Sequence, residues 1–428
     1  MKKRKIEPAR RLRGSILVPG DKSISHRSVM IGAISKGRTS VKGLLDCDDC
    51  NYTIRAFRNM GVRIFKDPGG GLIIEGRGLR GLKRPPGGAI YLGESGTTMR
   101  ILAGILAGQR FGVILKGGAS LSRRPMLRIV EPLSRMGIDI RAKAGRVPPL
   151  AIIGGPSRPI KYRTKVASAQ VKSCILMAGL YADGITTVTE PAMSRDHTER
   201  MLKYFGADIS RRGLSVSIRG SKAIGGRKIM VPGDISSAAF FLGAAVILPD
   251  SELTLKGVGL NPTRSGVISV LKRMGARIKI KNRTDPFEPA GDIEVGSGAT
   301  RGTIVEAKEL PGLIDEVPII AVVASRSSGR TVIKGAKELR VKETDRIRSI
   351  SANLNRMGAK VAVRGDTIVI DGVKALRGSK INAYGDHRTA MALSVAALSA
   401  DGVSELDDER CVAKSFPGFF KTLDRLRR

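Results

Sequence analysis

The stretches VPGDKSISHRS, residues 18–28, and VPGDISSAAFF, residues 231–241, open with the same four residues 213 positions apart. Each places an acidic residue directly after a Pro-Gly turn and before an apolar run, which is the pattern of a capped helix start. The first copy continues with Lys22, His26 and Arg27, whereas the second has uncharged residues in those places. A turn that occurs twice, with its charges in one copy only, indicates an internal repeat.

Glycine ends an amphipathic helix pattern and precedes an alternating, strand-like run at five places in the chain. Glycine just past a helix takes the left-handed conformation that other residues avoid, and the alternation after it is typical of a half-buried strand. These glycines are Gly61, Gly137, Gly206, Gly275 and Gly358.

A polar turn that opens a helix rich in Ala, Leu, Ile and Met occurs six times, at intervals of 66 to 81 residues. The turns start near Asp21, Glu94, Ser168, Asp234, Asp315 and Asp386. A short strand that closes on a turn also occurs six times, at 38–45, 112–121, 185–193, 252–260, 330–339 and 402–410. We therefore expect six units of about 70 residues, each with two helices and several strands.

The length of 428 residues exceeds what one ordinary core supports, so we expect two domains of three units each. The first would run over 21–231. The second would combine 232–428 with 1–20, because the N-terminal strand pattern completes its sheet. Crossings near 18–20 and 230–233 are expected to form a hinge.

The chain carries 75 Lys and Arg against 38 Asp and Glu, a net charge of +37. Such a charge is compatible with nucleic-acid binding or with anionic substrates. The basic residues are spread over the whole chain, however, and aromatic residues make up only 4% with no Trp. A platform for stacking bases needs aromatic residues among the cations, so a solvated basic surface is the favoured interpretation.

The apolar runs and the cysteines indicate the cellular compartment of the protein and whether it binds a metal. The longest apolar runs reach about 11 residues, too short to span a bilayer, and no signal-peptide pattern follows the basic N-terminus. Cys47 and Cys50 form a C-x-x-C motif without the second pair that a zinc site needs. We expect a cytoplasmic protein without a membrane segment, a metal or a cofactor.

Charged residues gather at five of the six polar turns and at the loops that follow them. Helix N-termini carry about half a positive charge each and bind anions, so six of them facing one cleft would trap anionic ligands. Several Arg and Lys residues add to this, and guanidinium grips carboxylates and phosphates in a bidentate manner. The two acids, Asp315 and Glu343, favour proton transfer rather than metal binding.

These motifs carry a resemblance to a known family. They are DKSISHR (21–27), SGTTMR (95–100), RRP (123–125), SAQVKS (168–173), the Asp315 turn, RVKETDR (340–346), GDHR (385–388) and AKSFP (413–417). Over nearly its whole length the chain resembles 5-enolpyruvylshikimate-3-phosphate (EPSP) synthases. The resemblance implies an α/β fold of two similar domains, each of three βαβαββ repeats in an inside-out barrel, with the active site in the interdomain cleft.

The resemblance also implies a reaction and its residues. The enolpyruvyl group of phosphoenolpyruvate moves to the 5-hydroxyl of shikimate 3-phosphate by addition and elimination. Asp315 would act as base, Glu343 as acid, and Lys22 would assist. Phosphoenolpyruvate would contact Lys22, Gly96, Arg124, Gln170, Arg346, Arg388 and Lys414. Shikimate 3-phosphate would contact Lys22, Ser23, Arg27, Ser168, Ala169, Gln170, Ser194, Arg195, Asp315 and Lys342.

Two other functions remain open at this point, a UDP-N-acetylglucosamine enolpyruvyl transferase and a basic nucleic-acid-binding repeat protein. The first shares the six-unit fold but is not expected to carry DKSISHR and RVKETDR. Glu94 departs from the family pattern, which often has Asn there, and adds negative charge beside the SGT turn. The retained Gly96 predicts inhibition by glyphosate, and we expect a monomer.

Overall fold

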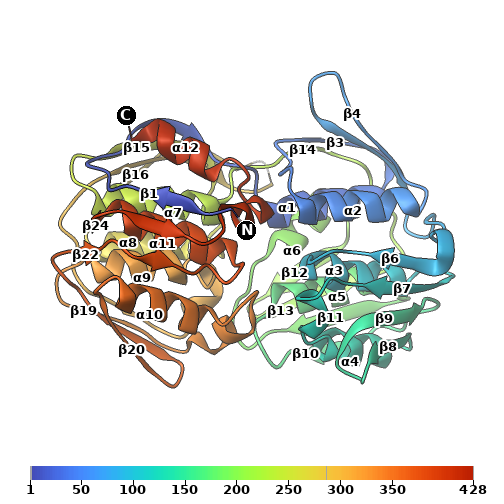
Figure 1. The fold of residues 1–428 in the computed structure, drawn as a ribbon. Helices are drawn as coiled ribbons and strands as arrows, with labels where there is room; N and C mark the ends of the chain where they lie inside the picture. The colour runs from blue at the N-terminus through green and yellow to red at the C-terminus, as the bar shows by residue number, and fades with distance from the viewer. Residues whose placement is uncertain (1, 286, 428) are drawn as a thin grey trace. The chain divides into compact units, whose positions relative to one another are not determined.

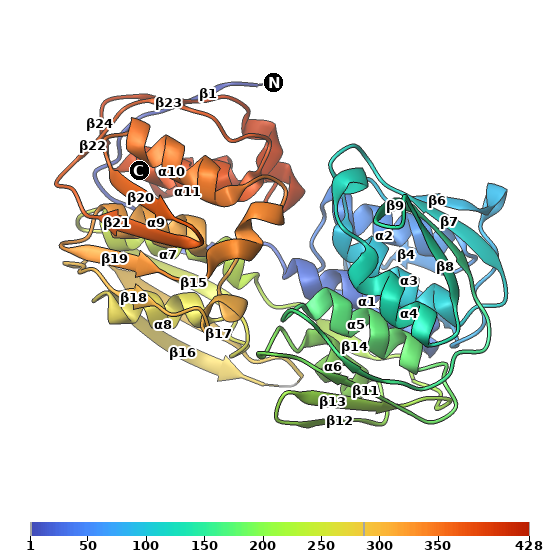
Figure 2. The ribbon, with the colours of Figure 1, turned by 90° about the horizontal axis from the view of Figure 1, so that it is seen from below.

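The computed structural model describes residues 2–285 and 287–427 and divides into two compact units. Unit 1 comprises Met1–Pro19 and Pro232–Arg428, and unit 2 comprises Gly20–Val231. Figures 1 and 2 show that each unit combines several helices with small, separate sheets.

Unit 2 contains three sheets of four strands, ordered β14-β3-β5-β4, β6-β7-β9-β8 and β10-β11-β13-β12. The first sheet is built from β3 (Lys36–Lys42), β4 (Arg63–Lys66), β5 (Leu72–Arg77) and β14 (Lys228–Met230). The second has β6 (Ala89–Tyr91), β7 (Gly112–Lys116), β8 (Asp139–Lys143) and β9 (Val147–Ile153). The third has β10 (Lys161–Arg163), β11 (Ile185–Thr189), β12 (Ile209–Arg212) and β13 (Ser215–Arg219).

The helices of unit 2 come in pairs, two to each sheet. They are α1 (Lys22–Ile34), α2 (Asp48–Asn59), α3 (Gly96–Ala107), α4 (Leu127–Arg135), α5 (Ala169–Gly179) and α6 (His197–Tyr204), with short 3-10 turns η1 (Pro86–Gly88) and η2 (Leu121–Arg123). The order of elements from β6 to β9 is strand, helix, strand, helix, strand, strand. The expected βαβαββ repeat is thus confirmed.

Unit 1 repeats this plan with strands taken from both ends of the chain. Its sheets are ordered β16-β17-β15-β2, β18-β19-β21-β20 and β1-β25-β23, with a further pair β22-β24. The N-terminal strands are β1 (Arg4–Ile6) and β2 (Arg13–Leu17). The others are β15 (Glu252–Gly259), β16 (Arg277–Thr284), β17 (Ala290–Gly296), β18 (Ile304–Val305), β19 (Arg330–Ile333), β20 (Lys360–Arg364), β21 (Thr367–Asp371), β22 (Leu376–Arg377), β23 (Lys380–Ile381), β24 (Ala400–Asp401) and β25 (Ser404–Leu406).

The sheets of both units share one pairing rule. In unit 1, β2 runs parallel to β15, and β15 then pairs antiparallel with β17. In unit 2, β6 and β14 are parallel partners of β7 and β3 in the same way. A parallel pair needs a crossover connection, which in β6 to β7 is the helix α3. Strands from remote parts of the chain, β2 and β14, occupy the same place in their sheets.

The helices of unit 1 are α7 (Ile235–Ile247), α8 (Gly266–Arg273), α9 (Val317–Ser325), α10 (Arg346–Arg356), α11 (His387–Leu398) and α12 (Phe419–Leu426), with 3-10 turns η3 (Leu310–Gly312), η4 (Ala336–Val341) and η5 (Glu409–Lys414). Every residue of α9 is buried, as are nearly all of α7 and α11. These three helices contact one another and form the centre of the core of unit 1. An all-round apolar helix is stable only when enclosed in this way.

The local predictions for the helix ends are confirmed. The five glycines after α2, α4, α6, α8 and α10 all have positive φ, between 83° and 102°. The six polar turns open α1, α3, α5, α7, α9 and α11, within two residues of the expected starts. Four of these six helices have a side-chain cap, from Asp21, Ser95, Asp234 and Asp386. Within the described residues, no helix is long and apolar enough to cross a membrane.

Candidate active site

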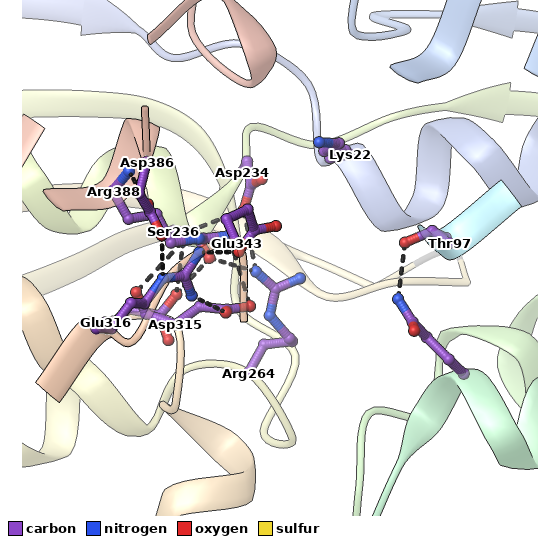
Figure 3. Close-up of polar contacts among 12 residues, drawn as sticks. Lys22, Thr97, Asp234, Ser236, Arg264, Asp315, Glu316, Glu343, Asp386 and Arg388 are labelled. Atoms are coloured by element: carbon purple, nitrogen blue, oxygen red, sulfur yellow. Dashed lines mark hydrogen bonds and ion pairs between the residues drawn. The ribbon is translucent and has the colours of Figure 1, made fainter. Parts of the chain in front are cut away.

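Arg346 is the centre of a buried ionic cluster in unit 1. It is the first residue of α10, and its side chain is 1% exposed. Its Nε lies 2.8 Å from Asp386 Oδ2, its Nη1 lies 3.0 Å from Asp315 Oδ1, and its Nη2 lies 2.5 Å from Glu343 Oε2. Burial by itself would lower the pKa of Arg346, but the three carboxylates outweigh it and hold that pKa above its usual value. Figure 3 shows these carboxylates gathered at one place.

Asp315 lies between two guanidinium groups. Besides its bond to Arg346, its Oδ2 lies 3.5 Å from Arg388 Nη2, and its backbone oxygen accepts a hydrogen bond from Arg388 Nη1 at 3.4 Å. The N-cap of α9 is Glu316, without a side-chain cap bond, so Asp315 does not cap this helix. Its carboxylate forms ion pairs with two arginines instead.

Asp386 supports both arginines from the start of α11. Its Oδ1 accepts a hydrogen bond from the backbone N–H of Arg388 at 2.8 Å, which is the helix cap, while its Oδ2 binds Arg346. One fully buried carboxylate thus fixes the start of α11 and the guanidinium of α10 at once. Sequence reasoning gave Asp386 no role in the site, because a cap residue alone is explained by helix chemistry.

A second buried cluster surrounds the polar turn of α7, and its cation was missed from the sequence. Arg264 Nη2 lies 3.1 Å from Asp234 Oδ1 and 2.7 Å from Ser236 Oγ. Ser236 in turn donates to Glu316 Oε1, the neighbour of Asp315 (Figure 3). Arg264 lies near the start of the second helix of its repeat, as Arg124 and Arg346 do in theirs. That shared place in the repeat is the signal that could have found it.

Two lysines of unit 1 that were expected in the site, Lys414 and Lys342, lie close to residues of the Arg346 cluster. Lys414, at the end of η5, donates from Nζ to the backbone oxygen of Gly385 at 2.9 Å. It therefore contacts the turn that precedes Asp386. Lys342 is the half-buried residue that ends η4, one residue before Glu343.

Lys22 in unit 2 is held by an acid that sequence reasoning also missed. It is the first residue of α1, and its Nζ forms an ion pair with Asp49 Oδ2. Burial would lower the pKa of Lys22, but Asp49 and the neighbouring Cys47 outweigh it and keep that pKa raised. Cys47 and Cys50, which flank Asp49, are buried thiols.

Three of the expected binding residues of unit 2 lie together at the start of α3. A Cβ added to Gly96 would lie 2.9 Å from Arg100 Nη1 and 3.3 Å from Arg124 Nη1. Arg100 Nη1 donates to Gln170 Oε1 at 2.6 Å. Gln170 Nε2 donates to Thr97 Oγ1 at 2.9 Å, and this bond is the dashed line at Thr97 in Figure 3. Gly96, Arg124 and Gln170 lie close together in unit 2, and Arg100 joins them. The two guanidinium groups approach the backbone at 96 so closely that even a Cβ there would press on them.

The departure at Glu94 has a structural explanation. Its Oε1 accepts a hydrogen bond from the N–H of Ser120 at 3.2 Å, and its Oε2 accepts one from the N–H of Leu121 at 2.6 Å. These amides begin η2, the turn that precedes Arg124. Helix starts favour negative charge, so the Glu94 carboxylate stabilises this loop.

The remaining expected residues of unit 2 lie at the starts of α1 and α5 and before α6. Arg27 is buried and donates from Nη1 to Ser23 O at 2.9 Å, from Nε to Thr198 Oγ1 at 2.6 Å and from Nη2 to Ser173 Oγ at 3.0 Å. The guanidinium therefore ties α1 to α5 and α6. Ser168 is the N-cap residue of α5, Ala169 is its first residue, and Ser194 and Arg195 lie in the segment before α6.

Comparisons with known proteins find relatives over nearly the whole length of the chain. Residues 6–423 match the family described as EPSP synthase (3-phosphoshikimate 1-carboxyvinyltransferase). A 3-phosphoshikimate 1-carboxyvinyltransferase of Desulforudis audaxviator is 49% identical over 425 residues, 99% of each chain. The solved EPSP synthase of Acinetobacter baumannii has a TM-score of 0.90 at 43% identity, over 100% of this chain and 98% of that one.

A more distant solved structure shares the fold alone. The enolpyruvyl transferase NikO of Streptomyces tendae reaches a TM-score of 0.79 at 18% identity, over 99% of this chain and 96% of that one. At that identity the likeness speaks for the architecture of six repeats and not for the chemistry. The whole-length match of sequence, fold and motifs places the chain in one family: it belongs to the EPSP synthases, the 3-phosphoshikimate 1-carboxyvinyltransferases.

Proposed function

We propose that this chain transfers the enolpyruvyl group of phosphoenolpyruvate to the 5-hydroxyl of shikimate 3-phosphate and releases phosphate. The product is 5-enolpyruvylshikimate 3-phosphate, on the route to chorismate and the aromatic amino acids. The observation that supports the proposed roles of the residues is that two carboxylates, Asp315 and Glu343, bind the same guanidinium, that of the buried Arg346.

The proposed mechanism needs one acid and one base. Asp315 accepts the proton of the 5-hydroxyl while the oxygen of that hydroxyl attacks C2 of phosphoenolpyruvate. Glu343, assisted by Lys22, delivers a proton to the methylene carbon. A tetrahedral intermediate forms and then expels phosphate as the methyl group returns its proton. General acid and base catalysis contribute about 10²–10⁴-fold each in rate. Arg346 forms ion pairs with both carboxylates, so the proposed base and the proposed acid lie within reach of the same guanidinium.

The anionic groups of the substrates would be bound by cations and by helix starts. For phosphoenolpyruvate we propose Lys22, Gly96, Arg124, Gln170, Arg346, Arg388 and Lys414. For shikimate 3-phosphate we propose Lys22, Ser23, Arg27, Ser168, Ala169, Gln170, Ser194, Arg195, Asp315 and Lys342. Support comes from their placement, because most of them lie at or directly before helix N-termini, where backbone N–H groups favour anions.

The test is a phosphate-release assay with purified protein. Release should require both substrates together, and UDP-N-acetylglucosamine should not replace shikimate 3-phosphate. Asp315→Asn, which keeps the shape and removes the charge, should lower kcat by about 10²–10⁴-fold. The matched control is Asp371→Asn, because Asp371 pairs with Arg330 on the exposed surface of the same unit. An Asp315→Asn enzyme with normal turnover would refute the role of this carboxylate.

Three further properties belong to the same proposal. Four buried free thiols suit a reducing compartment, and we propose the cytoplasm. We propose a monomer, which light scattering during gel filtration would check. We also propose inhibition by glyphosate competing with phosphoenolpyruvate, since at Gly96 no side chain comes between the backbone and the guanidinium of Arg124. Millimolar glyphosate without effect at low phosphoenolpyruvate concentration would contradict this.

A further inference from the structure

Lys172 is a fully buried lysine in α5 to which neither the sequence motifs nor the proposed mechanism gives a role. Its side chain is 0% exposed, and its Nζ lies 2.6 Å from Glu190 Oε2 and 2.8 Å from Glu199 Oε1. Glu190 is also fully buried, and Glu199 is 9% exposed. Charged groups are almost never buried to this degree unless they are paired, so the triad is a built feature of unit 2.

The three contacts of Lys172 span one segment of chain. Glu190 directly follows β11, and Glu199 lies in the first turn of α6. Between them, Lys172 Nζ also donates to the backbone oxygen of Ser194 at 3.4 Å. One ammonium group thereby holds the beginning, the middle and the end of the segment 190–199. Residues 190–196 form neither helix nor strand, so the backbone there has no ladder of its own to fix it.

The segment carries Ser194 and Arg195, which we have proposed as ligands of the phosphate of shikimate 3-phosphate. The hydroxyl of Ser194 donates to Glu190 Oε1, the second oxygen of the carboxylate that Lys172 binds. A serine hydroxyl has a single proton to donate. To donate to a phosphate, Ser194 must release Glu190, and the carboxylate then keeps Lys172 as its partner.

Charge gives Lys172 a second effect on the same segment. Glu190 and Glu199 bring two negative charges close to the residues proposed to receive a phosphate dianion. Arg211 Nη2 neutralises Glu199 from its other side, at 2.7 Å. Removal of the Lys172 charge would leave the buried Glu190 carboxylate with the Ser194 hydroxyl as its contact in this cluster. The negative charge of Glu190 would then repel an incoming anion.

We propose that Lys172 is a positioning residue for phosphate recognition: it fixes the segment 190–199 and balances Glu190, so that Ser194 and Arg195 can bind the phosphate of shikimate 3-phosphate. This rests on the proposed function, because it takes the substrate and the two phosphate ligands from there. The effect should be larger for this substrate than for phosphoenolpyruvate, since Ser194 and Arg195 are proposed as ligands of shikimate 3-phosphate alone.

The experiment compares KM values for the two substrates in Lys172→Met, which keeps the length of the side chain and removes its charge. The KM for shikimate 3-phosphate should rise at least about tenfold, since misplacement of about 1 Å can cost about 10²-fold. The KM for phosphoenolpyruvate should stay within about twofold. The matched control is Lys165→Met, a lysine of the same unit that is 82% exposed. Equal changes in both KM values, or no change, would overturn the proposal.

A companion variant separates positioning from simple loss of structure. In Lys172→Met with Glu190→Gln and Glu199→Gln, the buried charges are removed together, which proteins tolerate better than an unpaired buried charge. This variant should fold, and its KM for shikimate 3-phosphate should lie between those of wild type and Lys172→Met. If Lys172→Met fails to fold, the triple variant must still show the selective rise, and a triple variant with both KM values normal would refute the idea.

The dependence on the proposed function is tested in parallel. Ser194→Ala and Arg195→Gln should each raise the KM for shikimate 3-phosphate. If they do not, the assignment of the phosphate ligands fails, whatever Lys172 does. If they do and Lys172→Met behaves as wild type, the ligand assignment stands and the positioning role of Lys172 is wrong.

Discussion

Asp386 offers the sharpest test of the ionic cluster, because its two oxygens have different tasks. Oδ1 caps α11 through the N–H of Arg388, and Oδ2 binds Arg346 Nε at 2.8 Å. In Asp386→Asn the amide oxygen can keep the cap, since Asn caps helices as well as Asp does. Its NH₂ group then faces the N–H of Arg346, so two donors meet where an ion pair was. In Asp386→Ala both tasks are lost.

The expected magnitudes follow from these contacts. A hydrogen bond to a charged group contributes about 1.5–3 kcal/mol, and loss of one partner of a buried ion pair costs about 3–5 kcal/mol. Arg346 retains Asp315 and Glu343, so Asp386→Asn belongs at the lower end. We expect a loss of about 2–3 kcal/mol in the free energy of opening α10 and α11. Asp386→Ala should lose about 1 kcal/mol more, the value of the cap.

Hydrogen exchange followed by mass spectrometry measures this directly, because peptides from α10 and α11 report their own opening free energies. The control is Asp371→Asn, since Asp371 binds Arg330 through two hydrogen bonds of 2.7 and 3.1 Å in an exposed pair. Exposed pairs contribute less than about 1 kcal/mol. The reasoning is refuted if Asp386→Asn is no worse than this control, or if the alanine variant is as stable as the asparagine one.

Three further outcomes are expected. Burial lowers the pKa of His26 to about 3 from the ordinary 6.5, so the unfolded chain binds a proton that the folded protein does not. Stability should therefore fall as pH drops below about 6.5, by up to about 1.4 kcal/mol per pH unit, and urea titrations should show a flatter dependence in His26→Gln. Gly96→Ala should fold normally but raise the KM for phosphoenolpyruvate about tenfold, since its Cβ would lie 3.3 Å from Arg124 Nη1; a change below twofold contradicts this. Gly104→Ala should lower the free energy of unfolding by about 1–3 kcal/mol, and with it Tm, since its Cβ would lie 2.1 Å from the carbonyl oxygen of Cys174. Calorimetry that finds Tm unchanged would exclude this clash.

Features that depend on neighbours in sequence could be read from the sequence. The glycines after α2, α4, α6, α8 and α10 and the side-chain caps of α1, α3, α7 and α11 act within a single turn, so the repeat pattern predicts them without knowledge of the fold. Gly61 and Gly358 have positive φ as expected, and Asp21 and Asp386 cap their helices. The six repeats follow from counting these local signals.

Pairings between the helices of a repeat could not be read in the same way. Asp49 binds Lys22, and Arg264 binds Asp234, across separations of 27 and 30 residues. A chain with 75 basic and 38 acidic residues offers far too many candidate pairs to choose from. The choice is made by the packing of whole helices, which place side chains that share no local pattern. Lys172 remained without a role for this reason.

The contacts of Arg346 bear on how a substrate carboxylate could reach Glu343. Arg346 already gives three of its five N–H groups to carboxylates, so a substrate carboxylate that binds this guanidinium in a bidentate manner competes with one of them. Asp386 is fully buried and also caps α11, and Asp315 has Arg388 as a second partner, whereas the side chain of Glu343 is 27% exposed. Glu343 is therefore the carboxylate that is displaced at least cost. Binding of the enolpyruvyl donor to Arg346 would therefore act first on Glu343, the carboxylate proposed as the acid, and would leave Asp315 and Asp386 in place.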